Sequence, residues 1–140
     1  MTKEEELSRY MAQIEYYKEQ MNSLDQQFQF IQAAIADYSK AKITLEELEK
    51  TGSNSEILLP IGGSTYIDAK VNNTSTVLFD IGAGLVTEKK VNESIKKIDV
   101  RINDLQKNLE KLQTMMQQMQ SDATEISVKA QKLYSEIQQG

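Results

Sequence analysis

Glycine and proline are confined to the middle of this chain, and that placement constrains its fold more than any other feature. The 140 residues include one Pro and six Gly. Pro60 and all the glycines except Gly140 lie between positions 52 and 84. Residues 1–51 and 85–139 therefore contain neither residue type. Because Gly and Pro interrupt regular structure most strongly, the sequence predicts two long uninterrupted arms around one segment of turns.

The first arm carries apolar residues at alternating spacings of three and four. Two rows with a seven-residue repeat make up this seam: Leu7, Ile14, Met21, Phe28, Ile35 and Lys42, and Tyr10, Tyr17, Leu24, Ile31, Tyr38 and Leu45. Every member except Lys42 is apolar or aromatic. A period of 3.5 residues indicates a coiled-coil helix rather than strands. Thr2 and Glu5 fit a capping box at its start, and Gly52 is expected to end it.

The second arm repeats the pattern without an exception. Its two rows are Val91, Ile98, Leu105, Leu112, Met119, Ile126 and Leu133, and Ile95, Ile102, Leu109, Met116, Ala123, Ala130 and Ile137. A strict seven-residue repeat predicts a left-handed supercoil. Two starting points for this helix are open: Asn92 as its cap, or a start one or two residues earlier.

Each arm predicts a helix about 65–70 Å long at 1.5 Å per residue. Neither helix can bury its apolar stripe alone, so the arms are expected to pair. We favour antiparallel pairing within one chain, which brings together residues whose numbers sum to about 139. Parallel pairing between two chains is the alternative.

Between the arms the hydrophobic period changes from 3.5 to 2. Short apolar or alternating runs cover 57–61, 64–71, 76–81 and 85–90, with Gly and Asn between them. Four such runs separated by turn residues predict two consecutive β-hairpins. The overall expectation is an α+β fold in one domain, with helical arms at 1–51 and 91–139 and hairpins within 55–90.

Two hairpins have too little core to be stable alone in water. Their apolar residues are nevertheless too numerous to remain exposed. We therefore expect an oligomer that is assembled through these side chains: Leu59, Ile61, Ile67, Val77, Leu78, Phe79, Ile81 and Val86. Unpaired strand edges also favour an oligomer, because they can pair with a strand of another chain.

The composition argues against several classes of function. The chain has no Cys and no His, which excludes thiolate or imidazole catalysis and metal sites built on Cys or His. We predict no enzymatic activity, no catalytic or metal-binding residues and no cofactor. A net charge of −5 argues against nucleic-acid binding. No apolar run reaches the roughly 20 residues of a membrane span, and the acidic N-terminus is unlike a signal peptide. A cytoplasmic protein with no membrane partner is the expectation.

The middle segment resembles the prefoldin α class, and archaeal members in particular. The residues that carry the resemblance are Leu58–Ser64, Tyr66–Lys70, Val77–Gly84 and Glu88–Lys89. The order of helix, two hairpins and returning helix extends the likeness over the whole chain. Lys90 departs from it, at a position where a Ser or a similar cap is expected before the second helix.

This resemblance implies a molecular chaperone that works without ATP. Prefoldin is a hexamer of two α-class and four β-class subunits, in which hairpins from different subunits form a double β-barrel. The tips of its coiled coils hold non-native proteins, its clients, and deliver them to a group II chaperonin. A chain with two hairpins is expected to need a β-class partner.

At the predicted tips the seam weakens, because Ala123 and Ala130 replace larger residues and bury less area. Apolar residues on and beside the seam are candidates for client binding: Leu7, Tyr10, Met11, Ile14, Ile126, Val128, Leu133, Tyr134 and Ile137. The seam members also suit the coiled-coil core, whereas Met11, Val128 and Tyr134 lie off the seam. An alternative function is a tethering coiled coil with a β oligomerisation module and no client-holding activity.

Overall fold

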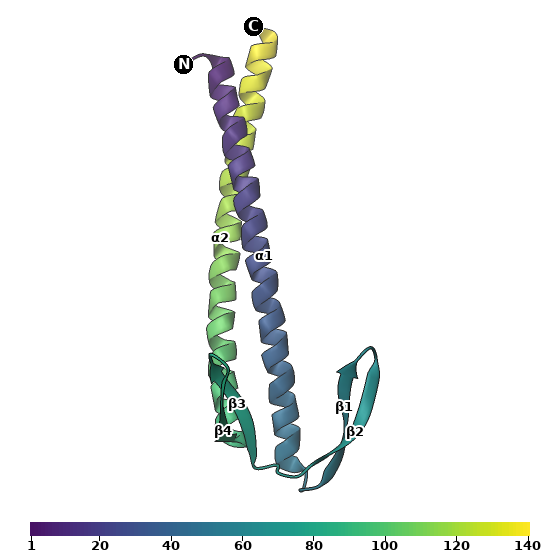
Figure 1. The fold of residues 1–140 in the computed structure, drawn as a ribbon. Coiled ribbons are helices and arrows are strands. Elements are labelled where there is room, and N and C mark those ends of the chain that lie inside the picture. Colours follow the sequence, from purple (N-terminus) through teal and green to yellow (C-terminus); the bar gives the residue numbers. More distant parts are fainter. The chain divides into compact units, whose positions relative to one another are not determined.

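The computed structural model describes residues 1–140 and contains two long helices and four strands (Figure 1). In chain order these are α1 (Lys3–Lys50), β1 (Ser55–Gly62), β2 (Thr65–Val71), β3 (Thr76–Gly82), β4 (Leu85–Lys90) and α2 (Val91–Gln139). Two helices joined by two antiparallel hairpins is the architecture that the sequence predicts.

The chain divides into two compact units, which are described separately. Unit 1 contains Met1–Ala34 and Leu105–Gly140, and unit 2 contains Ile35–Asp104. Each unit includes part of α1 and part of α2, and unit 2 also holds the strands.

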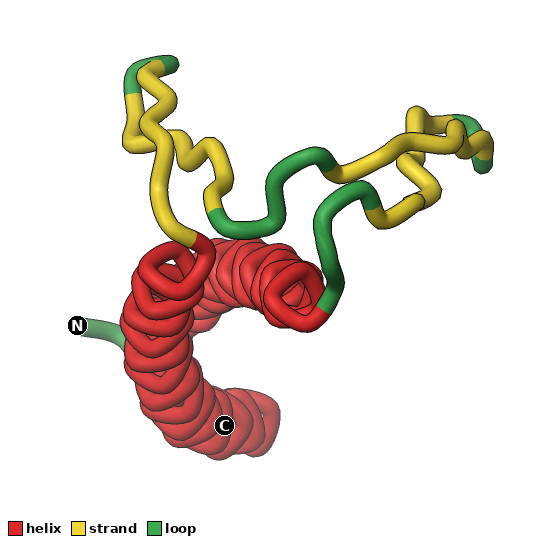
Figure 2. Tube along the Cα trace, turned by 90° about the horizontal axis from the view of Figure 1, so that it is seen from below, coloured by secondary structure: helices red, strands yellow, loops and turns green.

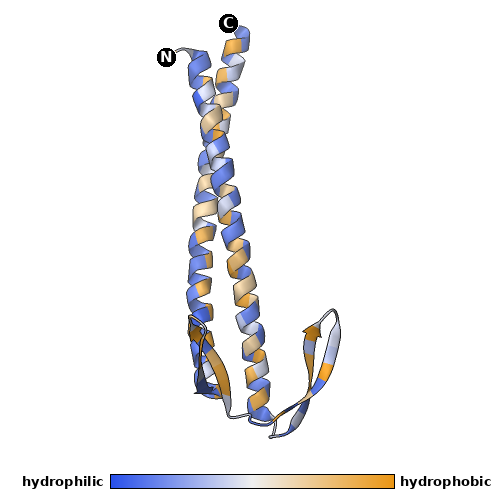
Figure 3. Ribbon diagram, in the orientation of Figure 1, coloured by the Kyte–Doolittle hydropathy of each residue, from blue (hydrophilic) through white to orange (hydrophobic).

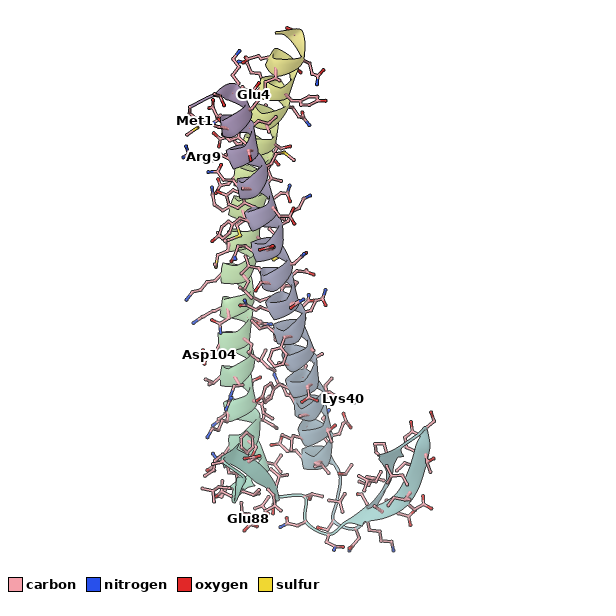
Figure 4. The ribbon with its side chains drawn as sticks, turned by 45° about the horizontal axis from the view of Figure 1, so that its top comes forward. Met1, Glu4, Arg9, Lys40, Glu88 and Asp104 are labelled. Carbon is pink, nitrogen blue, oxygen red and sulfur yellow. The ribbon has the colours of Figure 1, made fainter.

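In unit 1 the two helices run antiparallel, and both chain termini lie at the same end (Figure 1). Lys3 Nζ lies 3.7 Å from a carboxylate oxygen of Glu136, and the two residue numbers sum to the expected 139. Met1, Glu4 and Arg9 mark this end of the helix pair in Figure 4. The structure thus confirms antiparallel pairing within one chain.

The predicted seam is the part of each helix that is removed from solvent. All of its members, in both helices, are buried or half-buried. The six fully buried apolar residues all belong to it: Leu24, Val91, Ile98, Leu112, Ala130 and Leu133. Burial of this narrow stripe accounts for the core of the single chain.

The start of α1 follows the sequence prediction, and its end at Lys50 comes two residues before Gly52, although without the expected cap conformation. Thr2 Oγ1 accepts a hydrogen bond from Glu5 N at 3.2 Å, and Thr2 N donates one to Glu5 Oε2 at 3.3 Å. This pair is the predicted capping box. At the other end, Gly52 is not in the left-handed conformation of a typical C-terminal cap, and Asn54 adopts it instead with φ of 66°. Asn tolerates this conformation because its short side chain can hydrogen-bond locally.

Helix α2 begins at Val91, directly after β4, so Asn92 lies inside the helix rather than capping it. Asn92 Oδ1 accepts a hydrogen bond from Glu93 N. Val91 N donates to the carbonyl oxygen of Ser75 at 3.0 Å. A carbonyl that precedes β3 therefore satisfies one of the backbone donors that a helix start leaves unpaired.

The two hairpins are separate two-stranded sheets and share one geometry. The register shifts between Pro60 and Gly62 in the first hairpin, and 20 positions later, between Asp80 and Gly82, in the second. Both turns have positive φ at their two central residues, at Gly63–Ser64 and Ala83–Gly84. This is the conformation of a type I′ turn, whose twist suits antiparallel strands. The hairpin segment is thus a structural repeat of 20 residues.

The two hairpins differ in how the rest of the chain covers them. In β3–β4, Val77, Phe79, Thr87 and Lys89 are half-buried, whereas Leu78 on the opposite face is 76% exposed. Val77 and Phe79 line a groove together with residues of α1 and α2. Most residues of β1–β2 are exposed in both strands. Figure 2 shows both hairpins extending away from the helix ends. Both hairpins contain apolar residues (Figure 3), and several of them, including Leu59 and Leu78, are exposed in the single chain.

Lys42, the one charged member of the seam, forms an ion pair with the other helix within unit 2. Its Nζ lies 2.6 Å from Asp99 Oδ1. The hydrogen bond to Asp99 raises the pKa of Lys42 above its usual value. Near this pair, the Arg101 guanidinium lies 5.8 Å from the centre of the Tyr38 ring. Polar seam residues that find partners in this way favour one register of a coiled coil.

The turn at Ala83 offers a first test. A φ of 52° destabilises an L-residue by about 1 kcal/mol, whereas Gly adopts this conformation without that cost. We expect Ala83→Gly to slow amide hydrogen exchange in β3 and β4 by up to about fivefold. Ala36→Gly, in the interior of α1, is the control and should speed exchange around it. Faster exchange in the Ala83→Gly hairpin would contradict the turn geometry.

The Lys42–Asp99 pair predicts a dependence of stability on alkaline pH. Because the folded pKa of Lys42 is raised, its contribution is complete below the unfolded value of 10.5 and is lost as pH rises through the folded pKa. Asp99→Asn should lower the melting temperature at about pH 8 and have less effect at about pH 11.5. Glu47→Gln, which leaves this pair intact, is the control. A difference in melting temperature between wild type and Asp99→Asn that does not change with pH would contradict a contribution from the ion pair.

Candidate functional site

A groove runs between the helices of unit 1, beside the two seam alanines. It consists of two hollows of about 590 and 640 Å³ that share Ile14, Ser127 and Gln131. Ala123 lines the first hollow and Ala130 the second. The methyl side chain of Ala fills less space between two helices than the Leu or Ile found elsewhere in the seam. The weaker seam packing predicted at the two alanines therefore takes the form of a groove. We call it the terminal groove.

The terminal groove includes five of the nine residues predicted from sequence to bind clients. Leu7, Met11, Ile14, Val128 and Tyr134 line it. Among these, Met11 is 57% exposed, Val128 60% and Tyr134 55%. The off-seam candidates are thus available to a ligand.

The other four candidates do not line the groove and take part in the seam. Leu133 is 8% exposed, and Tyr10, Ile126 and Ile137 are half-buried. Tyr10 donates a hydrogen bond to Glu6 at 3.1 Å. This bond raises the pKa of Tyr10, so the phenol stays neutral well above neutral pH. These four side chains lie outside the terminal groove, and client binding by them stays a prediction.

The groove also contains residues that sequence reasoning missed. One side of it is formed by α2 side chains that are polar but uncharged: Gln120, Thr124, Ser127, Gln131 and Ser135. We call this row the polar lip. Its three- and four-residue spacing was visible in the sequence, but a polar row beside a seam reads as ordinary solvated surface.

A second exposed apolar surface lies on the hairpins. It contains six of the eight predicted assembly residues and four that were not predicted: Leu59, Ile61, Ile67, Leu78, Ile81 and Val86, with Ile57, Leu58, Tyr66 and Leu85. Strand pairing places Leu59 opposite Ile67 and Ile57 opposite Ala69. One face of β1–β2 is therefore apolar and uncovered, as expected of a surface that another chain covers.

The remaining two assembly candidates, Val77 and Phe79, contact this chain's own elements. They line the groove of unit 2 with Tyr38 and Ile98, and Leu78 lines it as well, but Val77 and Phe79 are half-buried whereas Leu78 is exposed. Lys89 Nζ and Lys97 Nζ lie 5.3 and 5.6 Å from the centre of the Phe79 ring. The nearby amino group of Lys89 lowers the pKa of Lys97. Phe79 thus helps to hold β3–β4 against the helices.

No group of three or more acidic, His or Cys side chains is placed to hold a metal ion. Neither helix has a stretch long and apolar enough to cross a membrane.

Comparison with known proteins decides the family. A family model described as Prefoldin subunit matches residues 17–136, which is most of the chain. The chain belongs to the prefoldin family. Prefoldin subunit alpha of Archaeoglobus fulgidus is 31% identical over 126 residues, which cover 90% of this chain and 92% of that protein. Human Prefoldin subunit 5 is also 31% identical, with 77% and 73% covered.

A solved structure supports the prefoldin fold. The crystal structure of the prefoldin beta subunit from Thermococcus strain KS-1 superposes with a TM-score of 0.61, covering 91% of this chain and 90% of that one at 16% identity. The α-class resemblance seen in the hairpin sequence agrees with the relatives named Prefoldin subunit alpha. A chaperone subunit that assembles with other prefoldin subunits is the role that this membership supports.

The exposed hairpin surface can be tested by substitution. Leu59→Asp together with Leu78→Asp should prevent assembly with a β-class prefoldin subunit, because a charge at each site would be buried without a partner. The helices should form as in the wild type. Phe30→Asp, at an exposed apolar position on α1 in unit 1, is the control.

Native mass spectrometry of the mixed subunits, with far-UV circular dichroism for helicity, gives both readouts. A complex of wild-type mass from the double variant would show that these side chains are not part of the interface.

Proposed function

We propose that this chain is the α-class subunit of a chaperone that holds non-native proteins without ATP and passes them to a group II chaperonin. The observation that carries the proposal is the terminal groove, an open site lined by Leu7, Met11, Ile14 and Tyr134 in a family of chaperone subunits. Non-directional apolar contacts suit a protein that accepts many sequences. Partial exposure of the groove keeps each contact weak enough to release.

The proposal assigns different tasks to segments of one domain. The helical arms, 1–51 and 91–139, hold the client, and residues 55–90 join subunits. Two α-class and four β-class chains would form the hexamer, with hairpins of different chains closing a β-barrel. The exposed apolar face of β1–β2 supports this assembly, because a two-stranded hairpin needs a partner to be stable. Several grooves on one complex would add their affinities through effective concentration.

Hexamer stoichiometry, transfer to the chaperonin and a cytoplasmic location rest on likeness to the prefoldin family. The proposal includes no catalytic step and no cofactor.

A tethering protein without client activity is the competing function. It would need the coiled-coil seam and the hairpins but not the exposed Met11, Val128 and Tyr134. Three large apolar side chains around one groove are costly to leave in water, and a client would cover them. Their exposure favours the chaperone.

Replacing Met11, Val128 and Tyr134 by Ser separates the two functions. In the complex with its β-class partner, we expect the triple variant to bind a permanently unfolded protein, such as reduced and carboxymethylated lactalbumin, at least about tenfold more weakly. The mass of the complex should not change. Phe30→Ser removes an even more exposed apolar side chain outside the terminal groove and should bind like the wild type.

Suppression of client aggregation, measured by light scattering, gives a second readout. If the triple variant binds and protects the unfolded protein as the wild type does, the groove is not the client site.

A further inference from the structure

The terminal groove is nearly free of charge, although charged residues make up 26% of the chain. Ten residues line the first hollow and eight the second, and Lys18 is the only charged residue among them. No carboxylate lines either hollow. The groove therefore offers apolar surface and neutral hydrogen-bonding groups, and electrostatic attraction contributes little to what it selects.

The neutral groups are ordered along one edge. The polar lip runs from Gln120 to Ser135 on α2, and its members recur every three or four residues. At 1.5 Å per residue they repeat about every 4.5–6 Å over about 22 Å. A Gln amide offers two donors and an acceptor, and a Ser hydroxyl offers both functions.

Part of the lip is not used within the protein. Thr124 Oγ1 donates to the Gln120 carbonyl at 2.8 Å and lies 3.4 Å from Gln120 Nε2. Ser127, Gln131 and Ser135 are left free to bond elsewhere. Their counterparts across the groove, Leu7, Met11 and Ile14, are apolar. One side can thus pair with polar groups of a ligand while the other covers its apolar groups.

An extended polypeptide has the complementary arrangement. Its peptide groups on one edge repeat every two residues, or about 6.7 Å, which flexible lip side chains can match. About seven extended residues span the 22 Å of the lip. A helical segment has already paired its N–H and C=O groups internally and gains nothing from the lip.

We propose that the terminal groove binds an extended client segment of about seven residues. About four of them hydrogen-bond through their backbone to Ser127, Gln131 and Ser135, which span about 12 Å, while apolar side chains of the segment pack against Leu7, Met11 and Ile14. The inference rests on the proposed client-holding function and specifies the conformation of the client. Because every sequence has the same backbone, such a site accepts many sequences. It rejects segments that have already folded into helices.

The deciding variant makes the groove more apolar. Ser127→Ala, Gln131→Met and Ser135→Ala together remove the lip's free hydrogen-bonding groups with little change in volume. The probe is a fluorescent peptide of about nine residues that alternates Val and Ser and is too short to fold, and binding is measured by anisotropy on the full complex. We expect affinity to fall about tenfold, although hydrophobic contact alone predicts an increase.

A matched peptide tests the backbone directly. The same sequence with N-methyl groups on alternate residues loses the donors along one edge. It should bind the wild type about tenfold more weakly than the plain peptide, and the lip variant should barely distinguish the two. A helical peptide of similar hydropathy, stabilised by α-methylated residues, should bind the wild type more weakly than the plain peptide.

The outcomes separate the two proposals. Equal or tighter binding of the plain peptide by the lip variant, or preference of the wild type for the helical peptide, overturns the extended-segment inference and leaves the client site in place. Failure of the wild type to bind the peptides and an unfolded protein alike overturns both. Circular dichroism and the mass of the complex establish that the variant is folded and assembled.

Discussion

The structure depends on burial of one narrow apolar stripe on each helix. Every fully buried apolar residue of the chain belongs to the seven-residue repeat, from Leu24 in α1 to Leu133 in α2. With no larger core available, the helices must keep this seam intact wherever they pair. Seam positions that lack a large apolar residue change the structure around them. Lys42 forms an ion pair with Asp99, and Ala123 and Ala130 line a groove.

The same shortage of core leaves apolar hairpin surface in the single chain that other subunits can cover. In β3–β4, Val77 and Phe79 are half-buried beside the chain's own helices, but Leu78 is exposed. The first hairpin has no such support. The two hairpins share the same register shift and the same turn conformation, and each has exposed apolar residues. Membership of the prefoldin family is consistent with covering these surfaces by other subunits.

Local features could be predicted from the sequence, and features that depend on distant contacts could not. The seam, the Thr2–Glu5 capping box and the strand alternation are visible within a few residues of one another. Val91 N donates to the Ser75 carbonyl, and Phe79 lies in a groove beside the helices. Both contacts join residues that are far apart in the sequence, so they could not be predicted from local patterns. The polar lip was missed because uncharged residues beside a seam gain meaning only when a groove opens next to them.

We propose that clients bind this subunit at the terminal groove and that the hairpins serve assembly. Photocross-linking measures this directly: an unfolded protein that carries benzophenone groups is bound to the complex, irradiated, and its attachment sites are mapped by mass spectrometry. The account predicts attachment within residues 7–22 and 120–135 of this chain. Attachment chiefly within residues 55–90, or spread evenly along both helices, would contradict it.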